Sequence, residues 1–184
     1  IPILGVNMGS MGFMAELERS ELSMLACLPG GNFTTEDRMM LDVRVRRGNK
    51  EILSDLALND AVISKGSMAR VAELEVLADD MEVSSIMGDG VIVATPTGST
   101  AYSMSAGGPI VEPTSRCLIF TPVCAHQLAA RAMVLDAHRR VTVRVPKTMR
   151  KYLFLSVDGG KAVRLGGGDR VEITCSDRYT RLVR

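Results

Sequence analysis

The stretch from residue 89 to residue 109 constrains the fold of this chain most, because an apolar run passes directly into a segment rich in hydroxyl residues and glycine. Val91–Ala94 form the apolar run, which is long enough for one buried strand. Thr95–Gly98 contain proline and glycine and interrupt it. Ser99 then has the side chain of an N-cap, which predicts a short helix over Thr100–Ala106.

A strand that turns through glycine into a helix N-terminus leaves backbone N–H groups free to face a ligand. Hydroxyl side chains in the same segment can bind sugar or phosphate oxygens without adding charge. Two interpretations stay open, since a Ser/Thr-rich loop can also use its hydroxyls to satisfy its own backbone. The residues concerned are Thr95, Thr97, Ser99, Thr100, Ser103 and Ser105.

The composition favours one large domain, or one domain and part of another. The chain has 184 residues, 46% of them hydrophobic, and a net charge of +1. No apolar run approaches the roughly 20 residues that cross a membrane, and no signal peptide opens the chain. Four scattered cysteines favour free thiols over a disulfide framework or a zinc site, which predicts a cytoplasmic protein. They are Cys27, Cys117, Cys124 and Cys175.

A basic stretch in the last third of the chain raises the question of nucleic-acid binding. Its charges alternate with valines, which is typical of a solvated strand face. Aromatic residues make up only 4% of the chain, which leaves little for base stacking. We therefore expect neither a nucleic-acid nor a membrane partner. The residues are Arg139, Arg140, Arg144, Lys147, Arg150 and Lys151.

The hydrophobic pattern changes along the chain. Ile3–Val6 predicts a strand, and Ser20 is a candidate N-cap for a helix over Glu21–Leu28. From Thr35 onward the apolar residues alternate with polar ones, which is typical of half-buried antiparallel strands. We expect an α/β remnant over residues 1–33 and a mainly antiparallel, sandwich-like β domain over residues 34–184.

The alternation is clearest in three segments, and two turns are expected between strands. The apolar positions are Leu41, Val43 and Val45, then Leu74, Val76 and Ala78, then Val141, Val143 and Val145. The turns are Asp79-Asp80 and Asp158-Gly159.

Several short motifs, taken together and in order, resemble the NAD kinase family. Thr95–Tyr102 reads Thr-Pro-Thr-Gly-Ser-Thr-Ala-Tyr and looks like the family's signature. Further matching blocks cover most of the chain: Gly5–Phe13, Leu58–Ile63, Ser105–Pro109, Thr121–His126 and Val157–Gly159.

The resemblance implies a two-domain NAD kinase-like fold in which nucleotides bind between the domains and the last segment packs back on the first domain. It implies transfer of the γ-phosphate of ATP to the 2′-hydroxyl of the adenosine ribose of NAD, giving NADP. The expected partners are NAD and ATP, with a divalent metal ion, Mg²⁺, and a homo-oligomer, either a dimer or a tetramer.

The resemblance also implies a set of NAD-binding residues. An amide beside a carboxylate can grip a ribose diol, and the family has glutamate where this chain has Asp60. The family has proline where this chain has Ala125, so that loop is expected to be less rigid. The implied residues are Met11 and Phe13 against the adenine, Asn59 and Asp60, Asp89 near the nicotinamide, Thr97, Thr100, Ala101, Tyr102 and Ser105 along the cleft, and Cys124 and His126 as backbone contacts.

The family carries its catalytic acid and phosphate cradle in a Gly-Gly-Asp-Gly motif just upstream of the segment that matches Gly5–Phe13, and this motif is absent from the chain. We therefore expect a fragment of a longer kinase, inactive by itself, and assign none of its residues a catalytic role. Two alternatives remain open at this stage: a lipid kinase of the diacylglycerol or sphingosine type, and a non-catalytic NAD-binding regulator.

Overall fold

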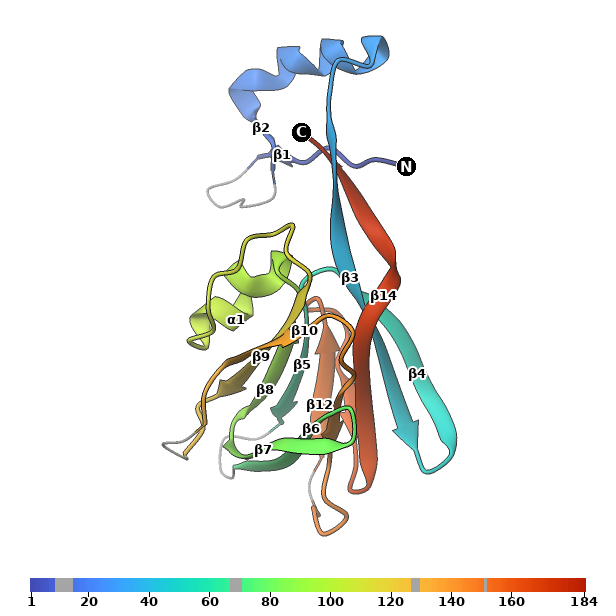
Figure 1. The fold of residues 1–184 in the computed structure, drawn as a ribbon, viewed down its shortest axis with the longest axis vertical. Coiled ribbons are helices and arrows are strands. Elements are labelled where there is room, and N and C mark those ends of the chain that lie inside the picture. Colours follow the sequence, from blue (N-terminus) through green and yellow to red (C-terminus); the bar gives the residue numbers. More distant parts are fainter. Residues whose placement is uncertain (9–14, 67–70, 127–129, 151) are drawn as a thin grey trace.

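Two antiparallel sheets of six strands each form the main body of the protein (Figure 1). The structure is a computed structural model that describes residues 1–8, 15–66, 71–126, 130–150 and 152–184. The first sheet has the order β10 (Met133–Asp136), β9 (Cys117–Val123), β8 (Gly90–Ala94), β5 (Asp60–Lys65), β12 (Leu153–Val157) and β13 (Val163–Leu165). The second has the order β4 (Lys50–Ala57), β3 (Thr35–Arg47), β14 (Asp169–Val183), β11 (Val141–Arg144), β6 (Ala72–Ala78) and β7 (Met81–Gly88).

The predicted alternation places the core between the two sheets. Leu41, Val43 and Val45 of β3 are fully buried and pack in one cluster with side chains from the facing sheet. Phe120 of β9 is among the largest of these buried side chains. Every second residue of these strands is apolar and points to the same face, so the two sheets pack with their apolar faces together. The predicted antiparallel β fold is confirmed.

The apolar run at residues 91–94 has a different cause from the alternating strands. All of β8 is buried, and its residues divide between two clusters on opposite faces of the sheet. Val91 and Val93 belong to the cluster between the sheets, whereas Ile92 and Ala94 pack on the outer face against Ala106 and Val111. A strand covered on both faces has no polar side, which accounts for its continuous apolar sequence.

Both predicted turns are present. Asp79 joins β6 to β7 with a φ angle of 56°, and Asp158 and Gly159 follow β12 with φ angles of 47° and 70°. Positive φ angles suit aspartate and glycine at hairpin turns.

The N-terminal segment differs from the prediction in two details. Helix η1 (Arg19–Gly30) is a 3₁₀ helix whose N-cap is Glu18, and Ser20 lies inside it. Glu18 and Glu21 form a reciprocal capping box, in which the Glu18 N–H donates to Glu21 Oε2 at 2.9 Å. The expected strand Ile3–Val6 is reduced to a single bridge at Ile3 and to β1 (Val6–Asn7), which pairs with β2 (Leu17–Glu18).

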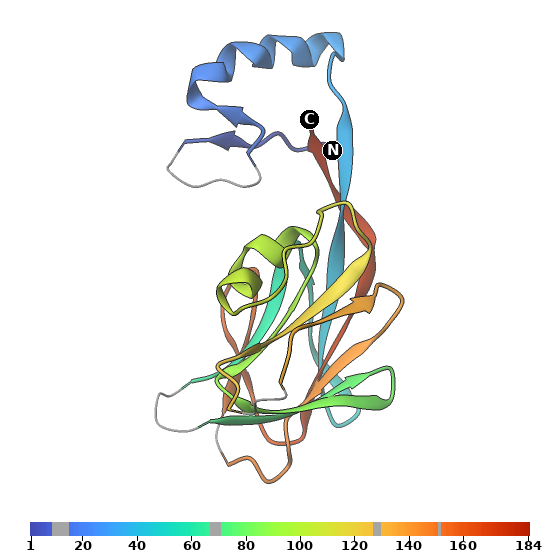
Figure 2. The same ribbon diagram turned by 60° about the vertical axis from the view of Figure 1, so that its left-hand side comes forward.

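A two-stranded arm joins this segment to the sandwich (Figures 1 and 2). Thr35–Met39 of β3 pair with Tyr179–Val183 of β14, beyond an irregularity in register after Cys175. At the end of the arm, Ile3 bonds to β14 through its N–H and its carbonyl, at 2.8 and 2.9 Å. None of the described helices is long and apolar enough to cross a membrane.

The buried position of Phe120 predicts a large cost for its removal. Phe120→Ala should lower the free energy of unfolding by about 3–5 kcal/mol, because it removes a large side chain and leaves a cavity. Val134→Ala is the control, since Val134 on the edge strand β10 is 54% exposed, and it should cost no more than about 0.5 kcal/mol. Urea unfolding followed by circular dichroism measures both; equal losses would contradict this packing of the core.

Candidate functional site

One carboxylate holds the start of β5 in place. Asp158 accepts hydrogen bonds from three consecutive backbone N–H groups, those of Leu58, Asn59 and Asp60, at 2.7, 2.8 and 2.9 Å. The Asp158 N–H in turn donates to the Asp60 carbonyl at 3.0 Å. The turn after β12 therefore fixes the backbone on which the predicted Asn59-Asp60 pair is displayed.

The segment that follows β8 rests on the same backbone. The Thr95 N–H donates to the Asn59 carbonyl at 2.8 Å, and Thr95 Oγ1 donates to the Leu58 carbonyl at 2.6 Å. Gly98 lies so close to Asn59 that a Cβ atom added at Gly98 would stand 2.0 Å from the Asn59 carbonyl oxygen. Glycine is needed here for this close approach. The structure thus brings together the two motifs at residues 58–63 and 95–102.

The predicted single helix is divided into two short pieces. They are the 3₁₀ turn η2 (Thr97–Thr100) and the helix α1 (Tyr102–Ser105), which meet at Ala101. Ser99 lies inside η2 and caps neither piece; its hydroxyl bonds instead to the N–H and carbonyl of Val111 at 3.1 and 3.2 Å. The prediction of a Ser99 cap was wrong because a serine hydroxyl can serve a distant loop as well as its own helix.

Of the six hydroxyl residues predicted either to bind a ligand or to satisfy the loop's own backbone, some do the second. Those of Thr95 and Ser99 bond to backbone, and Ser103 Oγ pairs with Thr121 Oγ1 at 2.8 Å. These three residues are fully buried and hold the loop together. Thr97 is 6% exposed and its hydroxyl accepts from Arg38 NH1, whereas Thr100 is half-buried and its hydroxyl donates to the Thr97 carbonyl at 3.4 Å. Ser105 is exposed on α1. Only part of the hydroxyl cluster is therefore accessible to a ligand.

Asp60 is a buried carboxyl with a shifted pKa. Only 5% of Asp60 is exposed, whereas Asn59 beside it is half-buried. Burial, together with the nearby negative charge of Asp158, raises the pKa of Asp60 to about 6. Asn59 is therefore the more accessible member of the predicted pair.

Three predicted site residues, Asp89, Cys124 and His126, lie near the start of β8, whereas Asn59 lies near its end. Asp60 pairs with Ala94 at one end of the β5–β8 ladder, whereas Lys65 lies beside Asp89 at the other. Five residues of strand separate these ends, which corresponds to about 17 Å. The Asp89 N–H donates to the Val123 carbonyl at 2.8 Å, next to Cys124.

In this second group, Asp89, Cys124 and His126, only the last two are exposed; Asp89 is half-buried and has a charged partner. Asp89 Oδ1 lies 2.6 Å from Lys65 Nζ. Cys124 is exposed with a φ angle of 47°, and His126 is exposed with its N–H donating to the Met87 carbonyl at 2.8 Å. Within this chain, Asp89, Cys124 and His126 therefore lie at the other end of the β5–β8 pair from Asn59.

The segment after α1 reaches toward the second group. A cavity of about 430 Å³ lies between Ala106 and Gly107 on one side and Cys124 and His126 on the other. Met11 and Phe13 lie outside the described residues. Among the residues that the structure describes, no three His, Cys, Asp or Glu side chains gather in a way that could hold a metal ion.

Comparisons with known proteins show the family and the fold of the chain. Residues 58–184, from the Asn59-Asp60 turn to the C-terminal end, match the family model of the ATP-NAD kinase C-terminal domain. The chain belongs to the NAD kinase family. It is 43% identical over 185 residues to the NAD kinase of Trichlorobacter lovleyi and 40% identical over 185 residues to that of Ruminiclostridium cellulolyticum. These alignments cover 100% of the chain and 65% of each relative.

Two solved structures of NAD kinase family members share the fold. The yeast NADH kinase complexed with NADH has a TM-score of 0.90 and 26% identity, over 99% of this chain and 54% of that chain. An NAD kinase from Archaeoglobus fulgidus in complex with ATP has a TM-score of 0.81 and 27% identity, over 100% of this chain and 68% of that chain. The NAD kinase-like architecture predicted from the motifs is confirmed.

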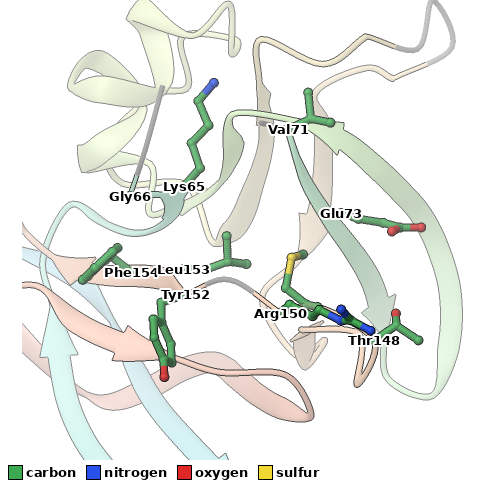
Figure 3. Close-up of a pocket in the computed structure, with 10 residues that line it drawn as sticks. Lys65, Gly66, Val71, Glu73, Thr148, Arg150, Tyr152, Leu153 and Phe154 are labelled. Carbon is green, nitrogen blue, oxygen red and sulfur yellow. The ribbon is translucent and has the colours of Figure 1, made fainter. Parts of the chain in front are cut away.

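A further cavity, of about 640 Å³, lies beside the end of β5 and the start of β12 (Figure 3). It touches the second group through Lys65, the partner of Asp89. Tyr152 at its rim is stacked under Arg164, whose Cζ lies 4.0 Å from the ring centre. The lining residues are Lys65, Gly66, Val71, Glu73, Thr148, Met149, Arg150, Tyr152, Leu153 and Phe154.

Two residues of the site were missed by the sequence analysis. Asp158 was expected as a turn residue within a matching family block, but it was not assigned to the site. Arg38 is 4% exposed, and its NH1 donates to Thr97 Oγ1 at 3.3 Å. It lies in a run of charged residues at the start of β3, and nothing in that run marks it as buried.

The raised pKa of Asp60 predicts a pH-dependent contribution to stability. The folded protein holds this proton more tightly than the unfolded chain, whose ordinary pKa is 3.8. The contribution is therefore present at low pH and is lost as the pH rises toward and through about 6. Unfolding in urea should show wild type losing about 3 kcal/mol relative to Asp60→Asn between about pH 3.5 and pH 7. A difference independent of pH would show that Asp60 is ionised without penalty.

Proposed function

We propose that the whole protein is an NAD kinase, which transfers the γ-phosphate of ATP to the 2′-hydroxyl of the adenosine ribose of NAD. The observation that carries the proposal is the contact between Gly98 and Asn59, which joins the two most specific family motifs in one place. The chain spans 65% of the length of the curated relatives that it matches, so the activity is assigned to the longer protein.

The residues around this contact would bind the dinucleotide. Asn59 offers an accessible amide that both donates and accepts hydrogen bonds, which suits a ribose hydroxyl. Tyr102, 46% exposed on α1, offers a ring face for stacking and a hydroxyl. We assign Asp60 to the same site as the buried neighbour of Asn59. We assign to the same surface Thr97, Thr100, Ala101 and Ser105.

The second group is assigned to a separate contact with the dinucleotide. Asp89, Cys124 and His126 would touch either the far end of a dinucleotide that extends past α1 or a dinucleotide bound to a neighbouring copy. We propose a homo-oligomer, a dimer or a tetramer. Exposed apolar side chains near the outer face of the first sheet support it, namely Met104, Ile110 and Val134.

The other components of the reaction follow from its chemistry. Phosphoryl transfer from ATP uses a divalent ion to neutralise the phosphates, and we propose Mg²⁺. The described residues gather no metal-binding group, so none of them is assigned to the ion. The family's catalytic Gly-Gly-Asp-Gly motif is absent from these 184 residues, and we propose that they show no turnover by themselves.

We also propose a cytoplasmic location and a boundary between two domains. All four cysteines are free thiols, which supports a cytoplasmic protein. We propose that residues 1–33 end an α/β nucleotide-binding domain and that residues 34–184 form the NAD-binding domain. The lipid-kinase and regulator alternatives are not favoured, because the curated relatives and solved neighbours are NAD or NADH kinases.

The test is ATP-dependent conversion of NAD to NADP by the full-length protein, measured with a coupled NADP-specific dehydrogenase. Wild type should form NADP, and Asn59→Ala should raise the KM for NAD about ten-fold, the loss of one or two hydrogen bonds. Asn32→Ala, at an exposed position after η1, is the matched control and should behave as wild type. Full-length protein that binds ATP but forms no NADP would contradict the proposal.

A further inference from the structure

A buried arginine connects the arm to the candidate site. Arg38 lies on β3 in the arm, and its guanidinium reaches the Thr97 hydroxyl at the start of η2. Arg38 is 4% exposed, and burying an arginine is costly unless its charge is compensated. The negative charge that compensates Arg38 therefore identifies the group that holds Arg38 against Thr97.

The compensating charge is Glu36, two residues earlier on the same face of β3. Glu36 Oε1 lies 2.5 Å from Arg38 Nε, off the line of a hydrogen bond, so the contact is an ion pair. The same Glu36 oxygen lies 3.3 Å from Arg184 NH2. Arg184 also pairs with Glu16, beside β2 in the N-terminal segment.

These contacts form a continuous chain of alternating charge, Glu16–Arg184–Glu36–Arg38, that ends on Thr97. It runs from the N-terminal segment along one face of the arm to the loop that follows β8. Isolated exposed ion pairs contribute little, but the side chains of Glu16, Glu36 and Arg184 are no more than 34% exposed. Arg38 also acts on Glu112, where it adds to hydrogen bonds from Thr114 that lower the pKa of that carboxyl.

We propose that Arg38 is a positioning residue for dinucleotide binding, held against Thr97 by Glu36 and Arg184. The proposal rests on the proposed function, in which Thr97 contacts NAD. Arg38 itself touches no substrate; it fixes the Thr97 side chain and the first turn of η2, and the charge chain orients that turn relative to the N-terminal segment.

The arm supplies a closely matched control. Asp37 lies between Glu36 and Arg38 but on the opposite face of β3. It pairs across the arm with Arg181, at 2.6 Å from Nε and 2.9 Å from NH2. This pair joins the same two strands, is exposed on both side chains, and has no link to Thr97 in the described structure. Loss of Asp37 would weaken the arm without releasing Arg38.

The experiment compares Glu36→Gln with Asp37→Asn in the full-length protein. Glu36→Gln should raise the KM for NAD about ten-fold, a typical strength for coupling between sites, with kcat within about two-fold of wild type. Asp37→Asn should leave both constants unchanged. Equal increases in KM in the two variants would show that the Glu16–Arg184–Glu36–Arg38 contacts only stabilise the arm, which would overturn the proposal. An unchanged KM in Glu36→Gln would also overturn it.

Arg184→Gln keeps the experiment decisive if Glu36→Gln does not fold, because it removes an outer link and leaves the Glu36–Arg38 pair intact. It should raise the KM for NAD about three-fold, and an unchanged KM would overturn the proposal. Wild-type NADP formation separately tests the proposed function. If wild type forms no NADP, NAD dissociation constants measured by calorimetry on the same proteins decide whether Glu36 positions the site.

Discussion

The candidate site depends on the carboxylate of Asp158. Three successive backbone N–H groups at the start of β5 donate to it, so the residues that precede a buried strand are held without regular ladder bonds. The same backbone then accepts the Thr95 N–H and leaves no room for a side chain at Gly98. If the turn after β12 were displaced, the Asn59 amide and the loop after β8 would move together.

Burial on both faces of β8 explains how the loop after it is held in place without a long helix. Ile92 and Ala94 are covered on the outer face by the segment that contains α1, and Ser103 is tied to Thr121 of β9. The short helical pieces are therefore held by packing and by side-chain hydrogen bonds rather than by helix propensity. The hydroxyls buried in this way stabilise the loop, whereas Tyr102 and Ser105 stay accessible.

Much of the fold could be predicted from the sequence, because alternation reports directly on which face of a strand is buried. The positions Leu41, Val43 and Val45 show this, as does the Asp158-Gly159 turn. Capping was predicted less well. Ser20 looked the better N-cap, since serine is preferred there, but the reciprocal bonds between Glu18 and Glu21 start the helix earlier.

The grouping of site residues could be predicted only in part. Family motifs named Asn59 and Asp89 alike, but a linear sequence does not say that they stand at opposite ends of one pair of strands. The burial of Arg38 could not be predicted for a related reason. It depends on Glu36 and Arg184, and Arg184 is distant in sequence. Contacts across the arm are long-range, and local patterns carry no signal for them.

The central claim is that the dinucleotide site is built on the backbone held by Asp158. Calorimetric titration of NAD into the full-length protein and its Asp158→Ala variant tests it most directly. Asp80→Ala is the control, because Asp80 is an exposed turn aspartate whose partner is Arg140, away from the site. The account predicts NAD binding at least about ten-fold weaker in Asp158→Ala alone, as expected when several backbone donors lose their acceptor. Unchanged affinity in a folded Asp158→Ala protein would contradict it.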